Sequence, residues 1–129
     1  RLGVPFDFDW QYRLADFSMQ GGYAAAEHLL AHCPGLTAIF AMSDLMALGA
    51  IRALQDHGLR VPQDVKIVSF DSTLYSLLTD PPLTSIERNP QSIAQKSCEL
   101  ILQMMRGEPP AETEIYIPTN LVERASTDG

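Results

Sequence analysis

Clustered positive charge, cysteine and tryptophan are all scarce in this sequence of 129 residues. No two Lys or Arg residues are adjacent and the formal net charge is −7, so we do not expect this chain itself to bind nucleic acid or a membrane surface. The two cysteines, Cys33 and Cys98, stand outside any Cys-x-x-Cys pair, which favours free thiols, with a disulfide as the alternative. No apolar run reaches 18 residues, so no membrane-spanning helix is expected.

Motifs for catalysis are missing as well. The sequence has no Gly-x-Ser-x-Gly elbow, no phosphate-binding loop, no Gly-x-Gly-x-x-Gly turn and no His-Glu-x-x-His pair. His28, His32 and His57 fall late in two predicted helices, where a cation suits the helix dipole, and their spread does not suggest a metal site. We therefore expect no enzyme activity, no cofactor and no metal. An α/β enzyme stays open as a third hypothesis, for which the sequence offers no nucleophile or base.

What the sequence does have is a regular alternation of strand-like and helical segments. Ser18, Ser43 and Asn89 suit helix N-caps. The patterns predict helices over 19–32, 45–57 and 90–106, and strands over 10–15, 37–42, 65–70, 83–88, 114–118 and 121–124. This order indicates an α/β fold with a doubly wound, mostly parallel sheet. Residues 65–70 lack apolar–polar alternation, so we expect helices to cover both faces of that strand.

Polar residues follow three of the predicted strands, as Asp16-Phe17-Ser18, Ser43-Asp44 and Asp71-Ser72-Thr73. Ligands of open α/β sheets bind outside the carboxyl ends of the strands, so these groups are expected to line one ligand cleft. Asp71 is placed to accept a hydrogen bond from a ligand hydroxyl, and Asp16, Asp44 and Thr73 are further possible contacts. Each also has a structural alternative: Asp71 as a turn cap, Ser43 and Asp44 as helix-start residues, and Phe17 as a core aromatic.

Three longer segments resemble one known family. TAIFAMSDLMALGAIRALQDHGLRVPQDVKIVSFDS, PPLTSIERNPQSIAQKSCELIL and IPTNLVERAST are similar to the C-terminal lobe of the effector-binding core of lactose-repressor/galactose-repressor (LacI/GalR) transcription regulators. The resemblance covers nearly the whole chain, with its motifs in the family's order. It implies one lobe of a two-lobed, type I periplasmic-binding-protein-like fold. It also implies a cytoplasmic regulator that binds a small molecule, usually a sugar, between its lobes and so controls operator binding.

The same resemblance implies roles for individual residues. Phe17 matches an aromatic that stacks on the ligand, and Asp71 matches a frequent acceptor of ligand hydroxyls. Ser43 stands where the family usually has Asn, and Ser72 stands where it has a second Asp. These two departures remove an amide and a carboxylate, so the ligand is expected to carry fewer hydroxyls. The alternative function is a periplasmic sugar-binding protein of an uptake system.

Domain organisation and assembly are implied in the same way. The DNA-binding headpiece and the N-terminal lobe would precede Arg1, so this chain would supply the C-terminal part of the effector-binding domain. Helix 90–106 is expected to belong to or pack on that missing lobe; alternatively, it folds back on its own lobe or packs on a second chain. Because the family dimerises, a homodimer is expected. Its candidate interface residues are apolar, although they could instead meet the sheet: Leu45, Leu48, Tyr75, Leu77 and Leu78.

Overall fold

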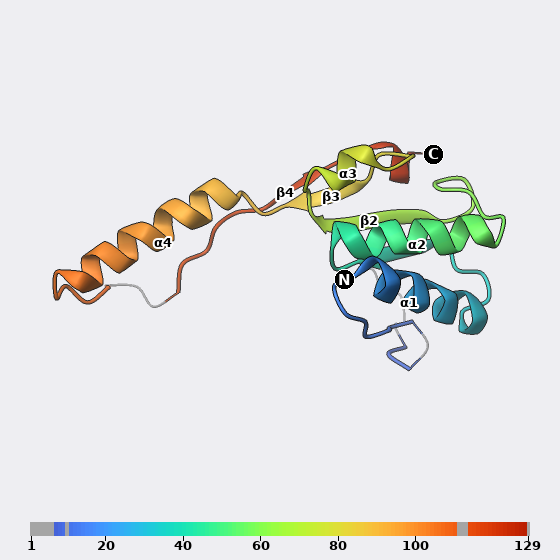
Figure 1. The fold of residues 1–129 in the computed structure, drawn as a ribbon, viewed down its shortest axis with the longest axis horizontal. Helices are drawn as coiled ribbons and strands as arrows, with labels where there is room; N and C mark the ends of the chain where they lie inside the picture. Colours follow the sequence, from blue (N-terminus) through green and yellow to red (C-terminus); the bar gives the residue numbers. More distant parts are fainter. Residues whose placement is uncertain (1–6, 10, 111–113, 129) are drawn as a thin grey trace.

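The structure, a computed structural model, describes residues 7–9, 11–110 and 114–128. Its elements follow one another as α1 (Met19–His32), β1 (Ala38–Ala41), α2 (Asp44–Asp56), β2 (Lys66–Asp71), α3 (Tyr75–Leu78), β3 (Thr84–Glu87), α4 (Pro90–Met105), β4 (Asn120–Val122) and the 3₁₀ helix η1 (Ala125–Thr127). Figure 1 shows them as a body that holds the sheet and most of the helices, and an arm formed by α4 and the chain that returns from it.

The long helices begin where their capping residues predict. The side chain of Ser18 accepts a hydrogen bond from the Gly21 amide at 2.9 Å at the start of α1. Ser43 caps α2 and Asn89 caps α4 through the amide three residues further on, each at 3.2 Å. These bonds satisfy amides that the first helical turn leaves without an intrahelical partner. All three predicted N-caps are therefore confirmed.

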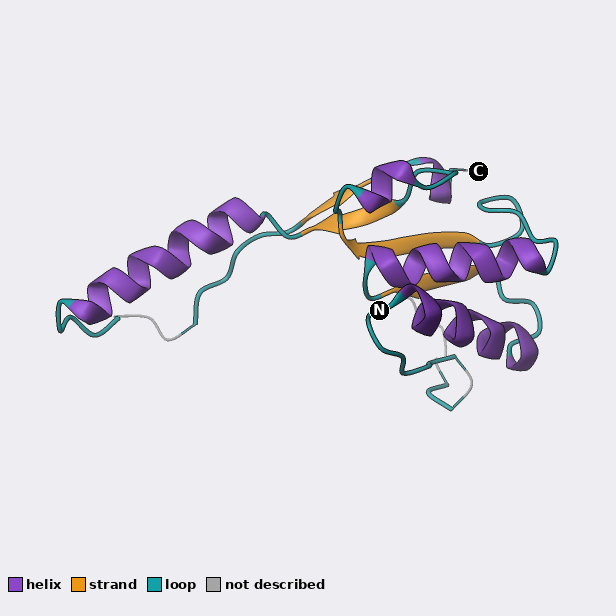
Figure 2. Ribbon diagram, in the orientation of Figure 1, coloured by secondary structure: helices purple, strands orange, loops and turns teal. Residues whose placement is uncertain are grey.

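The four strands lie in the order β1-β2-β3-β4. β1 pairs with β2 and β2 with β3 in parallel, whereas β4 pairs antiparallel with β3. Figure 2 shows α2 packed beside this sheet and α4 set apart from it. The expected α/β class with a mostly parallel sheet is confirmed.

Two predicted strands are wrong. Residues 11–15 form no strand, and Trp10, the first residue of that prediction, lies outside the described residues. Gln11 to Leu14 are exposed, so the apolar–polar pattern there reflects no burial on a sheet. Residues 114–118 are also without strand pairing, because they run along the arm beside α4 rather than beside β3 (Figure 1). The closing strand forms over Asn120–Val122 only.

The core lies on one face of the sheet. Ile39 and Ala41 of β1 and Ile67 of β2 are buried together with the inner side of α2. On the opposite face Phe40 remains 53% exposed. A cavity of about 780 Å³ lies beside β1, lined by Phe40, Val68 and Ile86 and also by residues of α1 and of the core, such as Ile39 and Ala41. The expectation that helices cover both faces of β2 is therefore wrong for the described part of the chain.

Helices α1 and α2 approach each other closely at two glycines. A Cβ atom on Gly49 would lie 2.0 Å from the carbonyl oxygen of Met19, and one on Gly22 would lie 2.1 Å from that of Met46. Both neighbours are backbone atoms of the facing helix, so a side chain has no room there. The two glycines thus place the N-terminal turns of α1 and α2 against each other.

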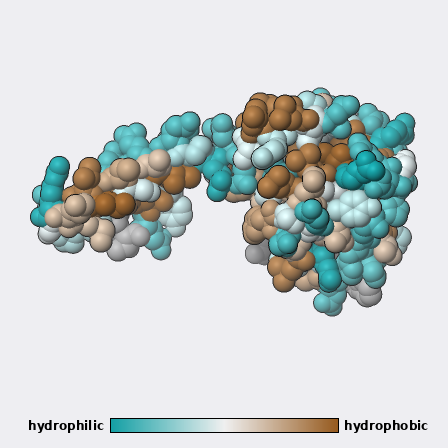
Figure 3. Space-filling model, viewed as in Figure 1, coloured by the Kyte–Doolittle hydropathy of each residue, from teal (hydrophilic) through white to brown (hydrophobic). Residues whose placement is uncertain are grey.

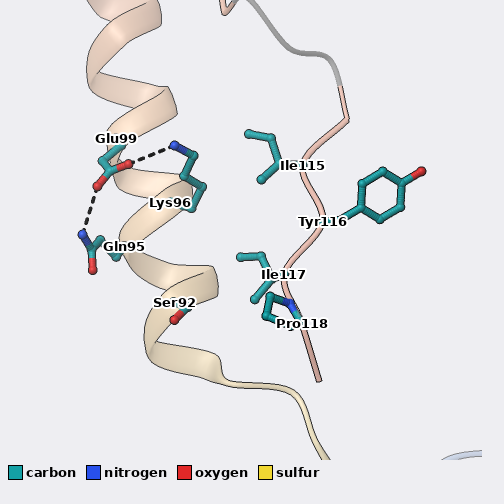
Figure 4. A pocket seen from close by; sticks show the side chains of 8 residues that line it. All are labelled: Ser92, Gln95, Lys96, Glu99, Ile115, Tyr116, Ile117 and Pro118. Atoms are coloured by element: carbon teal, nitrogen blue, oxygen red, sulfur yellow. Dashed lines mark hydrogen bonds and ion pairs between the residues drawn. The ribbon is translucent and has the colours of Figure 1, made fainter. Parts of the chain in front are cut away.

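The arm projects away from the body. No residue of α4 is buried, and its exposed apolar side chains include Ile101, Leu102, Met104 and Met105. Figure 4 shows Ile115 and Ile117 of the return segment pointing toward α4, while Tyr116 points away. A shallow hollow of about 300 Å³ lies between the two segments. The helix forms over almost the predicted span and does not fold back on the body.

Candidate functional site

Asp44, at the start of α2, is a buried carboxylate that receives four hydrogen bonds. Its Oδ1 accepts from the hydroxyls of Ser69 at 2.6 Å and Ser85 at 3.0 Å. Its Oδ2 accepts from the amide of Thr73 at 2.6 Å and from the Thr73 hydroxyl at 2.7 Å. Only 1% of Asp44 is exposed. Because a buried charge needs such partners, this carboxylate ties β2, β3 and the loop after β2 to the start of α2.

That loop has an unusual backbone. Asp71 has a φ of 109° and Ser72 a φ of 52°, both in a region that L-residues with side chains rarely adopt. The Ser72 amide donates to the Ser85 hydroxyl at 3.0 Å, which helps to hold the turn. Strain of this kind persists only where the surroundings over-determine it, and it concentrates at functional sites. The loop is therefore fixed by its neighbours rather than by its own preference.

Arg124 secures the far side of the same loop. Its Nη2 donates to the Ser72 hydroxyl at 3.1 Å, and its Nη1 donates to the Ser76 hydroxyl at 3.1 Å. The same Nη1 donates to the carbonyl of Leu83 at 2.5 Å. One planar guanidinium thus joins the loop, α3 and the residue before β3.

Asp71 itself faces a cation. Arg88 Nε lies 2.9 Å from Asp71 Oδ1, and the guanidinium carbon of Arg88 lies 6.0 Å from the centre of the Phe70 ring. Burial raises the pKa of the Asp71 carboxyl above its ordinary value of 3.8, Arg88 lowers it, and the nearby Asp44 carboxylate raises it, with a net increase. The Asp71 side chain keeps 22% of its area exposed and that of Arg88 keeps 51%, so the pair can be reached from outside.

Phe17 and Asp16 lie just before α1, whose first turn packs on α2. Phe17 is 66% exposed, so it is not a core aromatic of the described body. Asp16 Oδ1 accepts from the Ser18 hydroxyl at 2.5 Å and from its amide at 3.3 Å, which fixes the entry into the helix. The glycine contacts of α1 with α2 bring this segment to the end of the body where Ser43 and Asp44 begin α2.

The structure therefore brings the three predicted polar segments to one end of the body but gives their residues different positions. Phe17 and Asp71 are open to a ligand. Ser43 is buried and uses its oxygen to cap α2, and Asp44 is saturated by its four donors. Thr73 donates hydrogen bonds from both its amide and its hydroxyl to Asp44. Neither of the two cavities described above is lined by Phe17, Ser43 or Asp71.

The sequence patterns did not predict the contacts of two arginines, Arg88 and Arg124. Arg88 follows β3 immediately, and β3 lies beside β2 in parallel, so its position next to Asp71 follows from the strand order. The signal for Arg88 was thus present in the predicted strand ends. Arg124 contacts Ser72 and Ser76, about 50 positions away in the sequence, and no local sequence pattern predicts such contacts.

The candidate dimer residues lie at or near the surface. Tyr75, Leu77, Leu78 and the neighbouring Leu74 are all exposed. Leu45 is 37% exposed, whereas Leu48 is half-buried. Figure 3 shows a hydrophobic patch over α3. These residues form an apolar surface on α3 and the start of α2.

Metal and membrane features can be stated for the described residues only. They contain no group of three or more His, Cys, Asp or Glu side chains arranged to hold a metal ion. Among the same residues, no helix combines the length and the apolar character that crossing a membrane requires.

Comparison with known proteins identifies the family. A family model described as the periplasmic binding protein-like domain matches residues 6–127. The chain belongs to this family. Its similarity extends to MalR, a helix-turn-helix transcriptional regulator of Streptomyces coelicolor, with 39% identity over 86% of this chain and 32% of MalR. The fold agrees with that of the regulator CelR in complex with cellobiose, with a TM-score of 0.91 and 32% identity over 96% of this chain and 38% of that one.

The lac repressor dimer, solved with operator and the anti-inducer ONPF, has a TM-score of 0.81 and 34% identity over 88% of this chain and 34% of that one. The LacI-family resemblance drawn from the sequence motifs is therefore confirmed. These similar proteins are regulators rather than enzymes, in keeping with the expectation of a non-catalytic protein. The chain spans about a third of the length of the curated relatives that it matches.

Proposed function

We propose that this chain is the C-terminal part of the effector-binding domain of a LacI-family transcriptional regulator and that its effector is a neutral sugar such as a disaccharide. This replaces the ligand with fewer hydroxyls that Ser43 and Ser72 led us to expect. The observation that carries the proposal is the TM-score of 0.91 to CelR solved with cellobiose, over nearly the whole chain. MalR, CelR and the lac repressor are all named as regulators, so we prefer this function to that of a periplasmic sugar-binding protein. On this proposal the protein works in the cytoplasm.

The open side chains supply suitable chemistry. The exposed ring of Phe17 offers an apolar face on which a sugar ring can stack. Asp71 offers a carboxylate oxygen to a hydroxyl donor, and Arg88 offers N–H donors beside it. The ion pair has no net charge, so it favours a neutral ligand over an anionic one. Ser43, Asp44, Asp16 and Thr73 then serve mainly to shape this surface.

The regulatory step would be a shift between two states. An effector that contacts this body and a second lobe across a cleft stabilises their closed arrangement. A headpiece outside this chain would respond through a changed affinity for operator DNA, and the coupling is reciprocal. We also propose that the apolar surface on α3 and the start of α2, including Leu45, Leu48 and Tyr75, joins two copies in a homodimer.

The test is a thermal-shift screen of the intact protein against cellobiose, maltose, lactose, glucose, ribose, adenosine and glucose 6-phosphate. A sugar at 100 times its dissociation constant should stabilise the folded protein by about 2.7 kcal/mol. We expect a neutral disaccharide to give the largest increase in melting temperature. A response to glucose 6-phosphate or adenosine alone would contradict a neutral sugar effector, and silence from folded protein would contradict sugar sensing altogether.

A further inference from the structure

The arm joins the body at a narrow crossover. Only Arg88 and Asn89 separate the end of β3 from the first residue of α4. Asn89 has a φ of 52°, and its side chain caps α4 through the Ser92 amide. The returning chain re-enters the sheet at Asn120, which pairs with Glu87. The direction of the arm is thus set within a few residues of this point.

Arg88 fastens that crossover to the candidate ligand site. Asp71, at the end of β2, is in register with Glu87, so Arg88 is the first residue beyond the paired strands. Its Nε lies 2.9 Å from Asp71 Oδ1. Its guanidinium carbon lies 6.0 Å from the centre of the Phe70 ring, at the outer limit of a cation–π contact. Asp71 is held in turn by a loop that Asp44 and Arg124 fix from two sides. The ion pair therefore connects a rigid loop to the start of the arm.

We propose that Arg88 is a positioning residue that couples ligand contact at Asp71 to the crossover between the body and the arm. One carboxylate oxygen of Asp71 holds Arg88, and the other, Oδ2, accepts no hydrogen bond from the described residues. A ligand hydroxyl that donates to Oδ2 leaves the ion pair in place and adds a partner to the carboxylate. This restricts the motion of Asp71 and, through it, that of Arg88 and Asn89. The ligand half of this inference rests on the proposed sugar-binding function, whereas the restraint on the crossover does not.

Hydrogen–deuterium exchange of the intact protein, followed by mass spectrometry, tests both halves. The informative amides are those of Ser92 and Ile93, which bond to the side chain and carbonyl of Asn89. Arg88→Gln should make them exchange several-fold faster without changing the peptide that covers β2, and Arg88→Lys should restore part of the protection. Arg106→Gln, at the other end of α4, is the matched control and should leave these amides as in the unaltered protein.

The ligand arm uses cellobiose and maltose at saturating concentration. Either sugar, once bound, should slow exchange at Ser92 and Ile93 in the unaltered protein but not in Arg88→Gln. Unchanged exchange in ligand-free Arg88→Gln would overturn the positioning role. Equal slowing by sugar in both proteins would overturn the coupling while leaving sugar binding intact. If neither sugar binds, the proposed function fails in respect of these disaccharides and the coupling to them fails with it, and the ligand-free comparison still decides whether Arg88 fixes the crossover.

Discussion

Asp44 shows how one buried residue can organise the candidate site. Its carboxylate is buried and joins Ser69, Ser85 and Thr73. Asp44→Ala leaves these donors without an acceptor, so we expect a loss of about 2–4 kcal/mol in the free energy of unfolding. Urea denaturation of the intact protein measures this loss, and Glu108→Gln on the exposed loop after α4 is the control.

Asp44→Asn provides a graded comparison. The Thr73 amide can only donate, so the Asn carbonyl must face Thr73 and its NH₂ must face Ser69 and Ser85. Serine hydroxyls can accept as well as donate, so this variant should lose only about 1–2 kcal/mol. If Asp44→Ala unfolded at the same urea concentration as Glu108→Gln, the carboxylate would not organise the loop.

Replacing the Asp71 carboxylate is expected to increase stability near neutral pH, whereas replacing that of Asp44 decreases it. Its pKa in the folded protein is raised above 3.8, chiefly by burial, so ionisation costs more in the folded than in the unfolded state. As pH rises through this window, the unfolded state releases its proton first and the stability contribution of Asp71 falls. Asp71→Asn removes this dependence. The free energy of unfolding of Asp71→Asn, relative to that of the unaltered protein, should therefore increase from pH 4 to pH 7. Denaturation of both proteins at each pH measures this difference.

A difference that moved in favour of the unaltered protein over the same pH range would mean that the ion pair with Arg88 outweighs burial. The pH series measures only the stability of Asp71→Asn, so its effect on ligand binding is measured separately. Asp71 is held at a φ of 109°, and Asn has the same size and branching as Asp, so the substitution should leave the geometry of the turn unchanged.

At the scale of elements, the contact between α1 and α2 carries a clear prediction. Gly→Ala inside a helix normally stabilises it by about 0.5–1 kcal/mol. At Gly49 the new methyl group would instead meet the carbonyl oxygen of Met19 at 2.0 Å. We expect Gly49→Ala to destabilise the protein by about 1–3 kcal/mol, because the backbones of two helices must separate. Thermal unfolding measures it, with Gln20→Ala on the exposed side of α1 as the control. A Gly49→Ala protein more stable than the unaltered one would show that the helices do not touch here.

The elements that could be predicted are those with local signals. Helix starts were predicted correctly at Ser18, Ser43 and Asn89, because an N-cap bonds to an amide within four residues of the chain. The segments 10–15 and 114–118 carry strand-like residues, yet a strand needs a partner, and the sequence does not say which edges are free. The close approach of Gly22 and Gly49 depends on how two helices cross, which no local pattern encodes.

The candidate site was predictable to a similar degree. Placing Asp71 at the rim required only the rule that ligands meet the carboxyl ends of strands. Phe17 follows no strand, and the packing of α1 on α2 brings it to the same end of the body. The burial of Asp44 was not foreseen, because serines on two other strands supply its donors. The exposure of a residue depends on its neighbours in space, so the sequence could suggest a carboxylate at the rim but not which carboxylates stay open.

At the scale of the whole molecule, the arm packs on no other part of the described body. An isolated helix of 16 residues is marginal in water, and α4 has no buried residue. We therefore expect α4 to pack on a further part of the intact protein through its apolar side chains, among them Ile101 and Met104. Substituting Ile101→Asp should lower the melting temperature of the intact protein by several degrees, whereas Glu99→Ala on the polar side should not. Equal melting temperatures for the two variants would mean that the arm stays exposed.

On the proposed function, this body contributes Asp71 to a site for a neutral sugar. Calorimetric titration of the intact protein with cellobiose and with maltose, compared between the unaltered protein and Asp71→Asn, tests it most directly. We predict saturable binding of at least one of the two disaccharides and a roughly 10-fold or greater weakening in Asp71→Asn, the loss of a charge-assisted hydrogen bond. Binding of equal affinity in both proteins would remove Asp71 from the site, and the absence of binding in folded, unaltered protein would contradict a site for these disaccharides.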